Sequence, residues 1–440
     1  MPVNKNNPVK TDNSIYRQSE SLLSHAEEII PGGTQTFSKS KTQYPKGVSP
    51  FYASSAKGCK LIDIDGHEYI DFVNALCAVT LGYQDPDVDS AVRLQMNSGG
   101  VFTLPHPIEV EVAEQLCQMI PCAEMVRFGK NGSDATAGAV RLARAYTGRD
   151  HIAACGYHGW QDWFIGTTAR NLGVPKGVSE LTHTFNYNDI NSLEKIFDAY
   201  PNSIAGVIME PMNVSYPESG FLENVQKLCV NNKSLFILDE IITGFRYSRG
   251  GAQELFGVVP DLATFGKGLA NGYPLSAIVG RADVMSVMED AFFSFTMGSE
   301  ALSLAAANAT LKKIQNDPVI ERIYELGSYL ISEVQRLILK HNLSDIFNIS
   351  GHPSWSFLTI SDFAPYSSWE IKTFFYQEMF LRKILTLGTH NLSYSHSEQD
   401  VDRLIYVYDK VFPLLHQAVL NETLLDDINC DPLTPLFKVR

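Results

Sequence analysis

The sequence has little positive charge for its length. Its 440 residues include 35 Lys and Arg against 49 Asp and Glu, which gives a net charge of −14. Binding to nucleic acid depends on a basic surface that neutralises phosphates, so this balance argues against a nucleic-acid partner. A small anionic ligand remains compatible with the sequence, because a pocket can be locally positive in an acidic protein.

Paired cysteines and long apolar runs are also missing. The seven cysteines form no CxxC pair, and no cluster of His and Cys has the spacing of a metal site. We therefore expect reduced thiols, no metal and a cytoplasmic location. The N-terminus is polar rather than signal-like, and no apolar run approaches the roughly 20 residues that span a bilayer. We expect no membrane partner.

Apolar segments alternate with helical patterns in the middle of the chain, which predicts an α/β fold. A short strand at Met125–Phe128 precedes a helix whose stripe ends at Gly148. Alternation of this kind is typical of a wound, mostly parallel sheet. Further strands are expected at 151–155, 204–209, 234–239, 262–265 and 275–279, with helices near 190–200 and 221–232.

The pattern changes after residue 300 and predicts a smaller α+β domain. Ser397–Asp400 has the capping-box pattern that begins a final helix. Residues 61–72 read as a hairpin around Asp65-Gly66. The expected units are an N-terminal segment (1–75, beginning with a frayed tail at 1–13), a large domain (76–300), a small domain (301–425) and a draped or disordered tail (426–440).

Lys267 is the most distinctive single residue. It lies in Phe265-Gly266-Lys267-Gly268, where the flanking glycines allow a sharp turn and the close approach of a ligand. A lysine held away from full solvation can lose its proton and act as an amine nucleophile, for example toward an aldehyde cofactor. An ordinary exposed loop lysine is the competing interpretation. The segment fails as a Walker loop because Asp261 replaces the first glycine.

Four other patterns fit the same aldehyde chemistry. A helix start at Gly132-Ser133-Asp134 can hold a phosphate. Asp239, at the end of an apolar strand, can keep a pyridine nitrogen protonated. An aromatic residue in Tyr157-His158-Gly159-Trp160 can stack on a flat ring, and Thr296 can contact a phosphate. Each also has a structural interpretation, as a helix cap, a strand-end acid or a packed turn.

Taken together, these segments resemble the class III pyridoxal-phosphate aminotransferases, and within that group glutamate-1-semialdehyde 2,1-aminomutase. The resemblance covers most of the chain and is most specific around Asp239 and Lys267. The matching segments are IIPGG (29–33), GCKLIDIDGHEYIDFVNALCAVTLGY (58–83), NGSDATAGAVRLARAYTGR (131–149), YHGW (157–160), VIMEP (207–211), ILDEIITGFR (237–246), FGKGLANGYPLSAIVG (265–280) and SHSEQDV (395–401).

The resemblance implies a pyridoxal 5′-phosphate-dependent transferase of fold type I, similar to aspartate aminotransferase. It implies a homodimer with active sites at the subunit interface, to which the N-terminal segment contributes. Lys267 would be the Schiff-base lysine and Asp239 the partner of the pyridine nitrogen. The other implied cofactor contacts are Gly132, Ser133 and Asp134 at the phosphate, Tyr157 on the ring with His158 beside it, Glu210 shaping the pocket, and Thr296 reaching the neighbouring subunit's phosphate.

Several residues depart from the aminomutase pattern. Lys39 stands where the aminomutase has an arginine that binds the substrate carboxylate, and a lysine lacks its bidentate fork. Leu76 replaces an aromatic residue, and Gly388-Thr389-His390-Asn391 offers no acid where the aminomutase has a glutamate. Gly298-Ser299-Glu300 replaces its Gly-Asn-Pro. These departures leave the fold and the cofactor chemistry in place but put the substrate in doubt.

We therefore expect an aminotransferase that moves an amino group from an amino acid donor to an aldehyde or ketone, with sugars and phosphorylated metabolites as candidates. The alternatives are the intramolecular aminomutase, a racemase on the same scaffold, and a cofactor-binding protein without turnover. The residues expected to contact the acceptor are Lys39, Trp160, Trp163, His390 and Tyr394.

Overall fold

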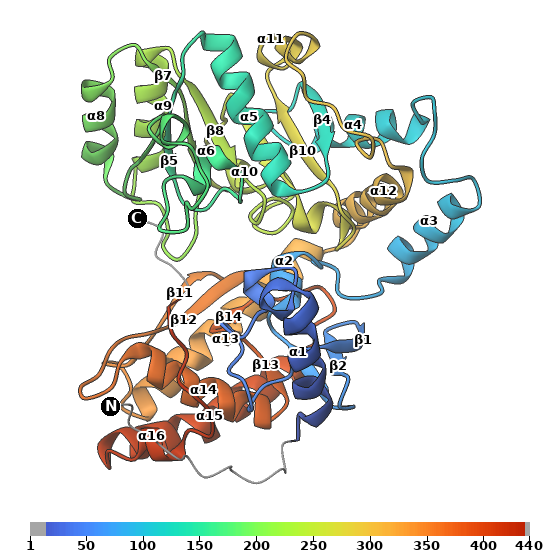
Figure 1. Ribbon diagram of the computed structural model, residues 1–440. Helices are drawn as coiled ribbons and strands as arrows, with labels where there is room; N and C mark the ends of the chain where they lie inside the picture. The colour runs from blue at the N-terminus through green and yellow to red at the C-terminus, as the bar shows by residue number, and fades with distance from the viewer. Residues whose placement is uncertain (1–14, 436–440) are drawn as a thin grey trace.

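A seven-stranded sheet forms the centre of the upper lobe in the computed structural model, which describes residues 15–435 (Figure 1). The strand order is β4-β10-β9-β8-β7-β5-β6. The five strands from β9 to β6 run parallel, and β10 is antiparallel to both β4 and β9. The bounds are β4 Met125–Gly129, β5 His151–Cys155, β6 Thr182–Thr184, β7 Ile204–Met209, β8 Leu235–Asp239, β9 Leu262–Phe265 and β10 Ser276–Gly280.

Helices cover both faces of this sheet, which explains why its central strands are continuously apolar. Every residue of β7, β8 and β9 is buried. Alternate residues of β7 and β8 pack against α5 on one face, and against α8 and α9 on the other. These helices are α5 Gly132–Thr147, α8 Ile190–Ala199 and α9 Phe221–Asn232. The shorter helices of this lobe are α6 Asp162–Ile165, α7 Lys176–Ser179, α10 Ala252–Phe256 and α11 Ala282–Met285.

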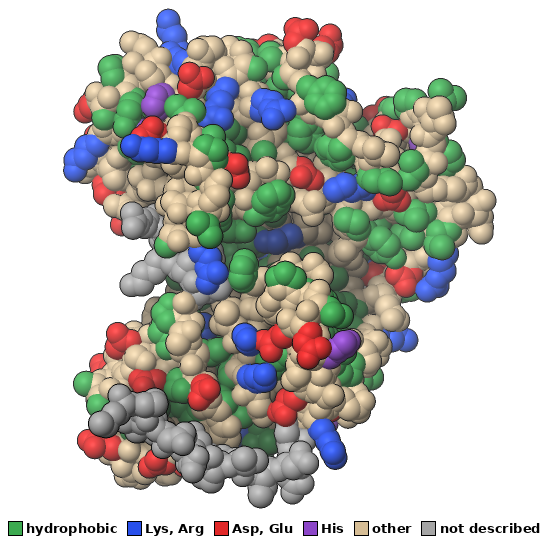
Figure 2. Space-filling view, in the orientation of Figure 1, with side chains coloured by type: hydrophobic (Ala, Val, Ile, Leu, Met, Phe, Trp, Pro, Cys, Tyr) green, Lys and Arg blue, Asp and Glu red, His purple; other side chains and the backbone are tan. Residues whose placement is uncertain are grey.

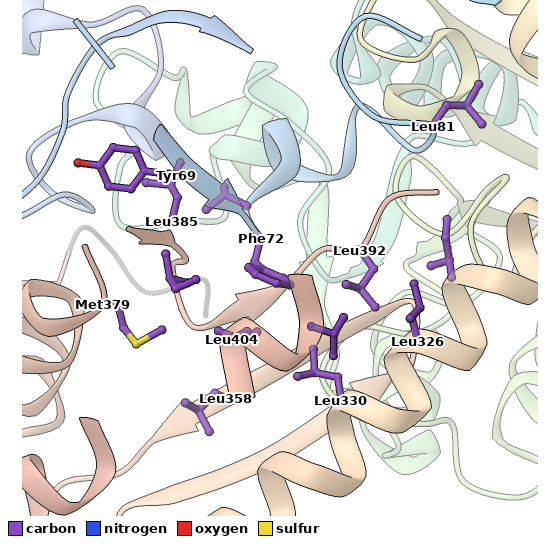
Figure 3. Packing of buried hydrophobic residues seen from close by; sticks show 14 of the residues in the cluster. Tyr69, Phe72, Leu81, Leu326, Leu330, Leu358, Met379, Leu385, Leu392 and Leu404 are labelled. Carbon is purple, nitrogen blue, oxygen red and sulfur yellow. The ribbon is translucent and has the colours of Figure 1, made fainter. Parts of the chain in front are cut away.

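The lower lobe joins the two ends of the chain. The antiparallel sheet β11-β12-β14 comes from the C-terminal part, and in a second sheet β3 pairs in parallel with β13. Phe72, just after β3, therefore packs among leucines of C-terminal segments (Figure 3). The strands are β1 Ala53–Lys57, β2 Lys60–Asp63, β3 Glu68–Asp71, β11 Phe347–His352, β12 Trp355–Ile360, β13 Ile384–Leu385 and β14 Thr389–His390; the helices are α1 Arg17–Ile29, α13 Val319–Lys340, α14 Ser368–Leu381, α15 Glu398–Leu420 and α16 Leu424–Asp427.

Helix α12 (Ala301–Asn316) connects the lobes. It packs against α3 (Pro86–Met96), α4 (Pro107–Met119) and the short 3-10 helix η3 (Lys267–Ala270). The sequence placed this helix in the 301–425 unit, but its contacts are mainly with segments before residue 300. The boundary between the lobes therefore falls after this helix rather than before it.

Arg246 lies fully buried where the lobes meet. Its Nη1 donates to the carbonyl oxygens of Ser354 at 2.9 Å and Leu392 at 2.8 Å, and Nη2 contacts Thr80 Oγ1 at 3.3 Å. No carboxylate among residues 15–435 forms an ion pair with this guanidinium. Because a buried charge must be satisfied by hydrogen bonds, these contacts fix the two lobes to each other.

The segment Asn74–Cys77, labelled α2, is a single left-handed turn. Its four residues have φ values of 50°, 48°, 58° and 67°. A left-handed conformation costs a residue with a side chain about 1–2 kcal/mol, so the surroundings must hold it. Asn74 Nδ2 donates to Val79 O at 3.1 Å, and Asp71 Oδ1 accepts from the amides of Val73 and Asn74.

The C-terminal segment packs on the lower lobe as far as it is described. Ile428 and Leu433 are buried, and the amide of Leu433 donates to Thr373 Oγ1 at 2.8 Å. The expected tail at 426–440 is therefore draped rather than disordered up to residue 435. The frayed tail expected at 1–13 lies outside the described residues. Within 15–435, no helix combines the length and apolar character needed to cross a bilayer.

The packing of α13 on the turn before β12 gives a stability test. A Cβ on Gly327 would lie 1.8 Å from the carbonyl oxygen of Pro353. We expect Gly327→Ala to reduce the free energy of unfolding by about 1–3 kcal/mol, measured as a lower apparent Tm in thermal scanning. Gly177→Ala is the matched control, since a Cβ there meets nothing within 4 Å. An unchanged Tm in Gly327→Ala would contradict the packing.

Candidate functional site

The site lies at the carboxyl edge of the central sheet, where β8 and β9 end side by side. Asp239, the last residue of β8, is in register with Thr264 of β9. Lys267 follows the end of β9 by two residues. Ligands of wound α/β sheets bind at this edge. Seen in Figure 2, the face between the two lobes is hollowed.

Lys267 is held in a strained turn with its amine in a desolvated setting. Its φ of 43° lies in the left-handed region, and a Cβ on the next residue, Gly268, would lie 2.5 Å from Thr80 Oγ1. Burial lowers the pKa of Lys267 below its ordinary value, outweighing the opposing effect of nearby acidic groups that include Glu210 and Asp239. None of the described residues hydrogen-bonds its Nζ. The amine is therefore available for attack on a carbonyl carbon.

Asp239 is a buried carboxylate held by three donors. It accepts from Thr264 Oγ1 at 3.2 Å and the amide of Ile241 at 3.1 Å, and its Oδ2 lies 2.7 Å from His158 Nδ1. His158 Nε2 contacts the carbonyl oxygen of Cys155 at 3.1 Å. A carbonyl oxygen only accepts, so Nε2 carries a proton, and the short contact at Nδ1 needs a second proton between ring and carboxylate. His158 Nδ1 and Asp239 Oδ2 therefore share one proton across this contact.

The first turn of α5 offers an anion site. The amides of Gly132 and Ser133 have no partner among the described residues, and the helix dipole favours negative charge there. Ser133 Oγ accepts from the amide of Trp160 at 3.3 Å. Asp134 faces the other way, because its Oδ2 accepts from the amides of Lys130 and Asn131 at 3.2 and 2.8 Å. The Asp134 side chain thus fixes the turn, and its contact with a phosphate stays a prediction.

Tyr157 and Glu210 lie on the neighbouring strand ends. The Tyr157 side chain is 50% exposed, its ring meets Phe164 edge-on at 5.6 Å, and its amide donates to Glu210 Oε2 at 3.1 Å. Burial raises the pKa of Glu210, and the charge of Asp239 raises it further. Glu210 therefore ties the Tyr157 turn to β7, as expected for a residue that shapes the pocket.

The other predicted residues separate into exposed and buried groups. Thr296 is exposed in the loop before α12, whose N-cap is Glu300, so Thr296 is no helix cap. Trp160 is exposed and Tyr394 is half-buried. Lys39 lies at a cavity of about 510 Å³ between the N-terminal segment and the left-handed turn, lined also by Tyr44, Tyr52, Leu76 and Tyr83.

Three predictions are wrong or need correction. His390 is fully buried in the lower lobe, with its ring nitrogens 2.9 Å from Ser356 Oγ and 2.8 Å from Tyr408 OH, so it cannot contact an acceptor. Trp163 is buried beneath His158, with the two rings 6.1 Å apart. His158 itself touches Asp239, so it acts on a ring nitrogen through that carboxylate.

A family model for class III aminotransferases matches residues 43–351. The chain belongs to the class III aminotransferase family. It is 34% identical over 394 residues to a 3-aminobutyryl-CoA aminotransferase of Cloacimonas acidaminovorans, covering 87% of this chain and 94% of that protein. It is 38% identical over 333 residues to a glutamate-1-semialdehyde 2,1-aminomutase of Syntrophobacter fumaroxidans, covering 71% and 76%. The fold class expected from the sequence is confirmed.

A solved structure of the FumI protein of Sphingopyxis sp. MTA144, with bound pyridoxal phosphate, superposes with a TM-score of 0.85 at 28% identity, covering 94% of this chain and 98% of that one. An omega-transaminase from Sphaerobacter thermophilus superposes with a TM-score of 0.82 at 25% identity, covering 92% and 99%. Class III aminotransferases depend on pyridoxal phosphate, so this chain is a pyridoxal-phosphate-dependent enzyme.

The residues present fit this cofactor. A Cβ on Gly159 would lie 2.2 Å from Ser133 Oγ, so the glycine keeps the predicted phosphate turn open. The Asp239 carboxyl group suits the ring nitrogen, and the Lys267 amine suits an aldehyde. The three groups thus match the phosphate, the ring nitrogen and the aldehyde of pyridoxal phosphate.

Some site residues carry no local signal in the sequence. Thr264 reaches Asp239 only because β8 and β9 are in register. Lys130 Nζ forms an ion pair with Glu300 Oε2 at 3.0 Å, joining the predicted phosphate turn to the N-cap of α12. The first contact depends on the register of two strands, and the second joins residues 170 positions apart, so both follow from the fold and not from a local motif. Covariation of each pair in related sequences would reveal these contacts.

Gly159 provides a test of the phosphate turn. We expect Gly159→Ala to weaken pyridoxal phosphate binding at least tenfold, about 1.4 kcal/mol, because its Cβ displaces Ser133. Gly173→Ala is the matched control: its φ is +92° against +99° at Gly159, but a Cβ there meets nothing within 4 Å. Kd measured by fluorescence titration of the apoprotein distinguishes them. Equal Kd values for the two variants would argue against the turn.

Proposed function

We propose that the protein transfers an amino group from an amino acid donor to an aldehyde or ketone acceptor, through a Schiff base at Lys267. The observation that carries this proposal is the meeting of Lys267 and Asp239 at adjacent strand ends. The desolvated amine of Lys267 and the buried carboxylate of Asp239 are groups that this chemistry requires. A binding protein without turnover would need neither group in this state.

Each residue takes one role. When bound, pyridoxal phosphate supplies an aldehyde for amine exchange and a ring that withdraws electrons. Asp239 pairs with the ring nitrogen, and His158 holds the Asp239 carboxyl group in position. The amides of Gly132 and Ser133 hold the phosphate, and Tyr157 covers the ring. Lys267 Nζ removes the proton from Cα of the donor and returns a proton to C4′, the aldehyde carbon of the cofactor.

The cavity beside the left-handed turn is the acceptor site in this proposal. The lining combines Lys39 with aromatic and aliphatic residues that include Tyr44, Tyr52, Leu76 and Tyr83. It also includes Asp71, whose carboxyl group accepts a hydrogen bond from the Tyr83 hydroxyl at 2.7 Å. The turn also joins this cavity to the lysine, since Cys77 lies close enough to Lys267 to affect its pKa. An acceptor with an apolar body and an anionic group suits this lining.

The second candidate is the intramolecular aminomutase. It is supported by the 38% identity to the Syntrophobacter fumaroxidans aminomutase. Lys39 and Leu76 argue against it, because they replace the arginine and the aromatic residue of the aminomutase pattern and both line the cavity. The 3-aminobutyryl-CoA aminotransferase similar to this chain favours transfer between two molecules.

Substitution of Lys267 tests the proposal directly. We expect Lys267→Ala to lose at least 1,000-fold in the rate of the donor half-reaction, since proton transfer alone contributes about 10²–10⁴-fold. The measurement is stopped-flow absorbance of the loaded protein with a panel of amino acids. Lys195→Ala is the control, because Lys195 is an exposed lysine on α8, away from Lys267 and the predicted phosphate turn. A half-reaction of wild-type rate in Lys267→Ala would refute the proposed role.

Incubation with glutamate-1-semialdehyde, without an added donor, separates the two candidates. An aminotransferase gives no sustained turnover under these conditions. Steady conversion to 5-aminolevulinate would establish the aminomutase. Turnover that appears only with an amino donor and a carbonyl acceptor would support intermolecular transfer. Because the semialdehyde and 5-aminolevulinate are isomers of equal mass, they are separated by chromatography before detection by mass spectrometry.

We further propose a homodimer formed around the loop that carries Thr296. Apolar side chains are exposed on this loop, on the neighbouring segment before α4 and on the first turns of α4, namely Val101, Phe102, Leu104, Val110, Phe292, Phe295 and Met297. A cavity of about 520 Å³ between α4 and this loop is lined by Val110 and Phe295. Exposed apolar patches of this kind mark interfaces, and dimers are the commonest assembly.

Charge inserted into this patch tests the dimer. We expect Val110→Asp to convert the dimer to monomer in light scattering after size exclusion, because it buries an unpaired carboxylate. Val230→Asp is the control, since Val230 is similarly exposed (68% against 60%) but lies on α9. Dissociation by Val230→Asp alone would place the interface elsewhere.

A further inference from the structure

A second cavity lies in the lower lobe, apart from Lys267. It has a volume of about 310 Å³ and lies between α14 and the edge of β12. We propose that it binds a small organic carboxylate whose body is planar and apolar. Its floor is formed by Trp369, Lys372 and Tyr376, which lie on one face of α14 at helical spacing.

Lys372 supplies the positive charge. Its Nζ lies 4.9 Å from the centroid of the Trp369 ring and 5.3 Å from that of Tyr376. No carboxylate among residues 15–435 forms an ion pair with it. Burial lowers the pKa of Lys372 to about 8, so the amine is mostly protonated at pH 7. The ring faces stabilise the cation but leave its hydrogen-bonding capacity to a ligand.

Tyr376 supplies a second, independent polar group. Its side chain is fully buried, and its hydroxyl has no hydrogen-bond partner among residues 15–435. The hydroxyl lies 3.6 Å from the position that a Cβ on Gly388 would occupy, and Gly388 also lines the cavity. A buried hydroxyl without a partner is unfavourable, and a hydrogen bond to a ligand oxygen would remove this cost.

The walls select the body of the ligand. Leu358, Ile360 and Leu387 line one side, and the indole of Trp369 offers a flat surface. β14 pairs with β12 at Ser356 and Phe357, and the amide of Leu358 donates to the carbonyl oxygen of Gly388 at 2.9 Å. The part of β12 that follows, Thr359 and Ile360, also borders this cavity. Phosphate is a poorer fit, because the amides at the N-terminus of α14 that could bind it already have acceptors. Glu370 Oε2 accepts from the amide of Ser367, and Asp362 Oδ1 accepts from the amide of Ser368.

Lys383 is a matched control within the same lobe. Its Nζ also lies over two rings, at 5.9 Å from Tyr16 and 5.2 Å from Tyr69, and burial lowers its pKa. It differs in two respects: Asp63 opposes the shift in its pKa, and it does not line the cavity. Any effect of charge or aromatic stacking alone would appear at both lysines.

The first test is competitive acetylation of the loaded protein at pH 8, read by mass spectrometry. We expect phenylacetate to slow acetylation of Lys372 at least fivefold and to leave Lys383 unchanged. Phenylacetamide, which has the same ring without the charge, and inorganic phosphate should protect neither lysine. Equal protection by phenylacetamide, protection by phosphate alone, or no protection at saturating phenylacetate would each overturn the proposal.

Calorimetry with substituted proteins provides the second test. We expect Lys372→Met to weaken phenylacetate binding at this site at least tenfold, and Lys383→Met to leave it unchanged. Lys372→Arg keeps the charge and should retain binding within about threefold. The apparent Tm of each variant is measured alongside its affinity. A loss of binding that is caused by misfolding is then recognised by a lowered Tm. Wild-type affinity in Lys372→Met would exclude the proposed carboxylate site.

Discussion

The guanidinium of Arg246 is the contact on which the arrangement of the site depends. It is fully buried and binds carbonyl oxygens of Ser354 and Leu392 from the lower lobe, together with Thr80 from the segment after the left-handed turn. Hydrogen bonds to a charged group contribute roughly 1.5–3 kcal/mol each, and a buried charge that lost them would be strongly destabilising. Because Arg246 follows β8 by only seven residues, the same contact fixes the lower lobe relative to Asp239.

The chemistry of the site follows from burial at the edge of the sheet. Desolvation has opposite consequences for its two central groups: it favours the neutral form of Lys267 but would also favour the neutral form of an isolated acid. Asp239 differs from an isolated acid because Thr264 and the amide of Ile241 donate to it and His158 Nδ1 lies 2.7 Å away. A desolvated amine and a hydrogen-bonded carboxyl group therefore lie at the ends of adjacent strands, a combination that pyridoxal-phosphate chemistry uses.

Much of this could be predicted from local patterns. The parallel strands, the helix starts at Pro107 and Ser397, and the positions of Lys267 and Asp239 follow from periodicity, capping residues and a resemblance that covers most of the chain. His390 was misassigned because a histidine near a glycine looks the same in sequence whether it faces a ligand or Tyr408. Arg246, Thr264 and the Lys130–Glu300 pair depend on segments brought together by the fold, so no local pattern could identify them.

The left-handed turn at Asn74–Cys77 has a consequence for altering substrate preference. It forms part of the cavity wall through Ala75 and Leu76 on one side, and it packs near Lys267 through Cys77 on the other. A β-branched residue is least tolerant of a left-handed backbone, so variation here would move the lysine as well as the wall. In the proposed acceptor site, lining residues outside the turn, such as Tyr44 and Tyr52, do not carry this constraint. Evolution and protein engineering therefore have one adjustable side of this cavity and one fixed side.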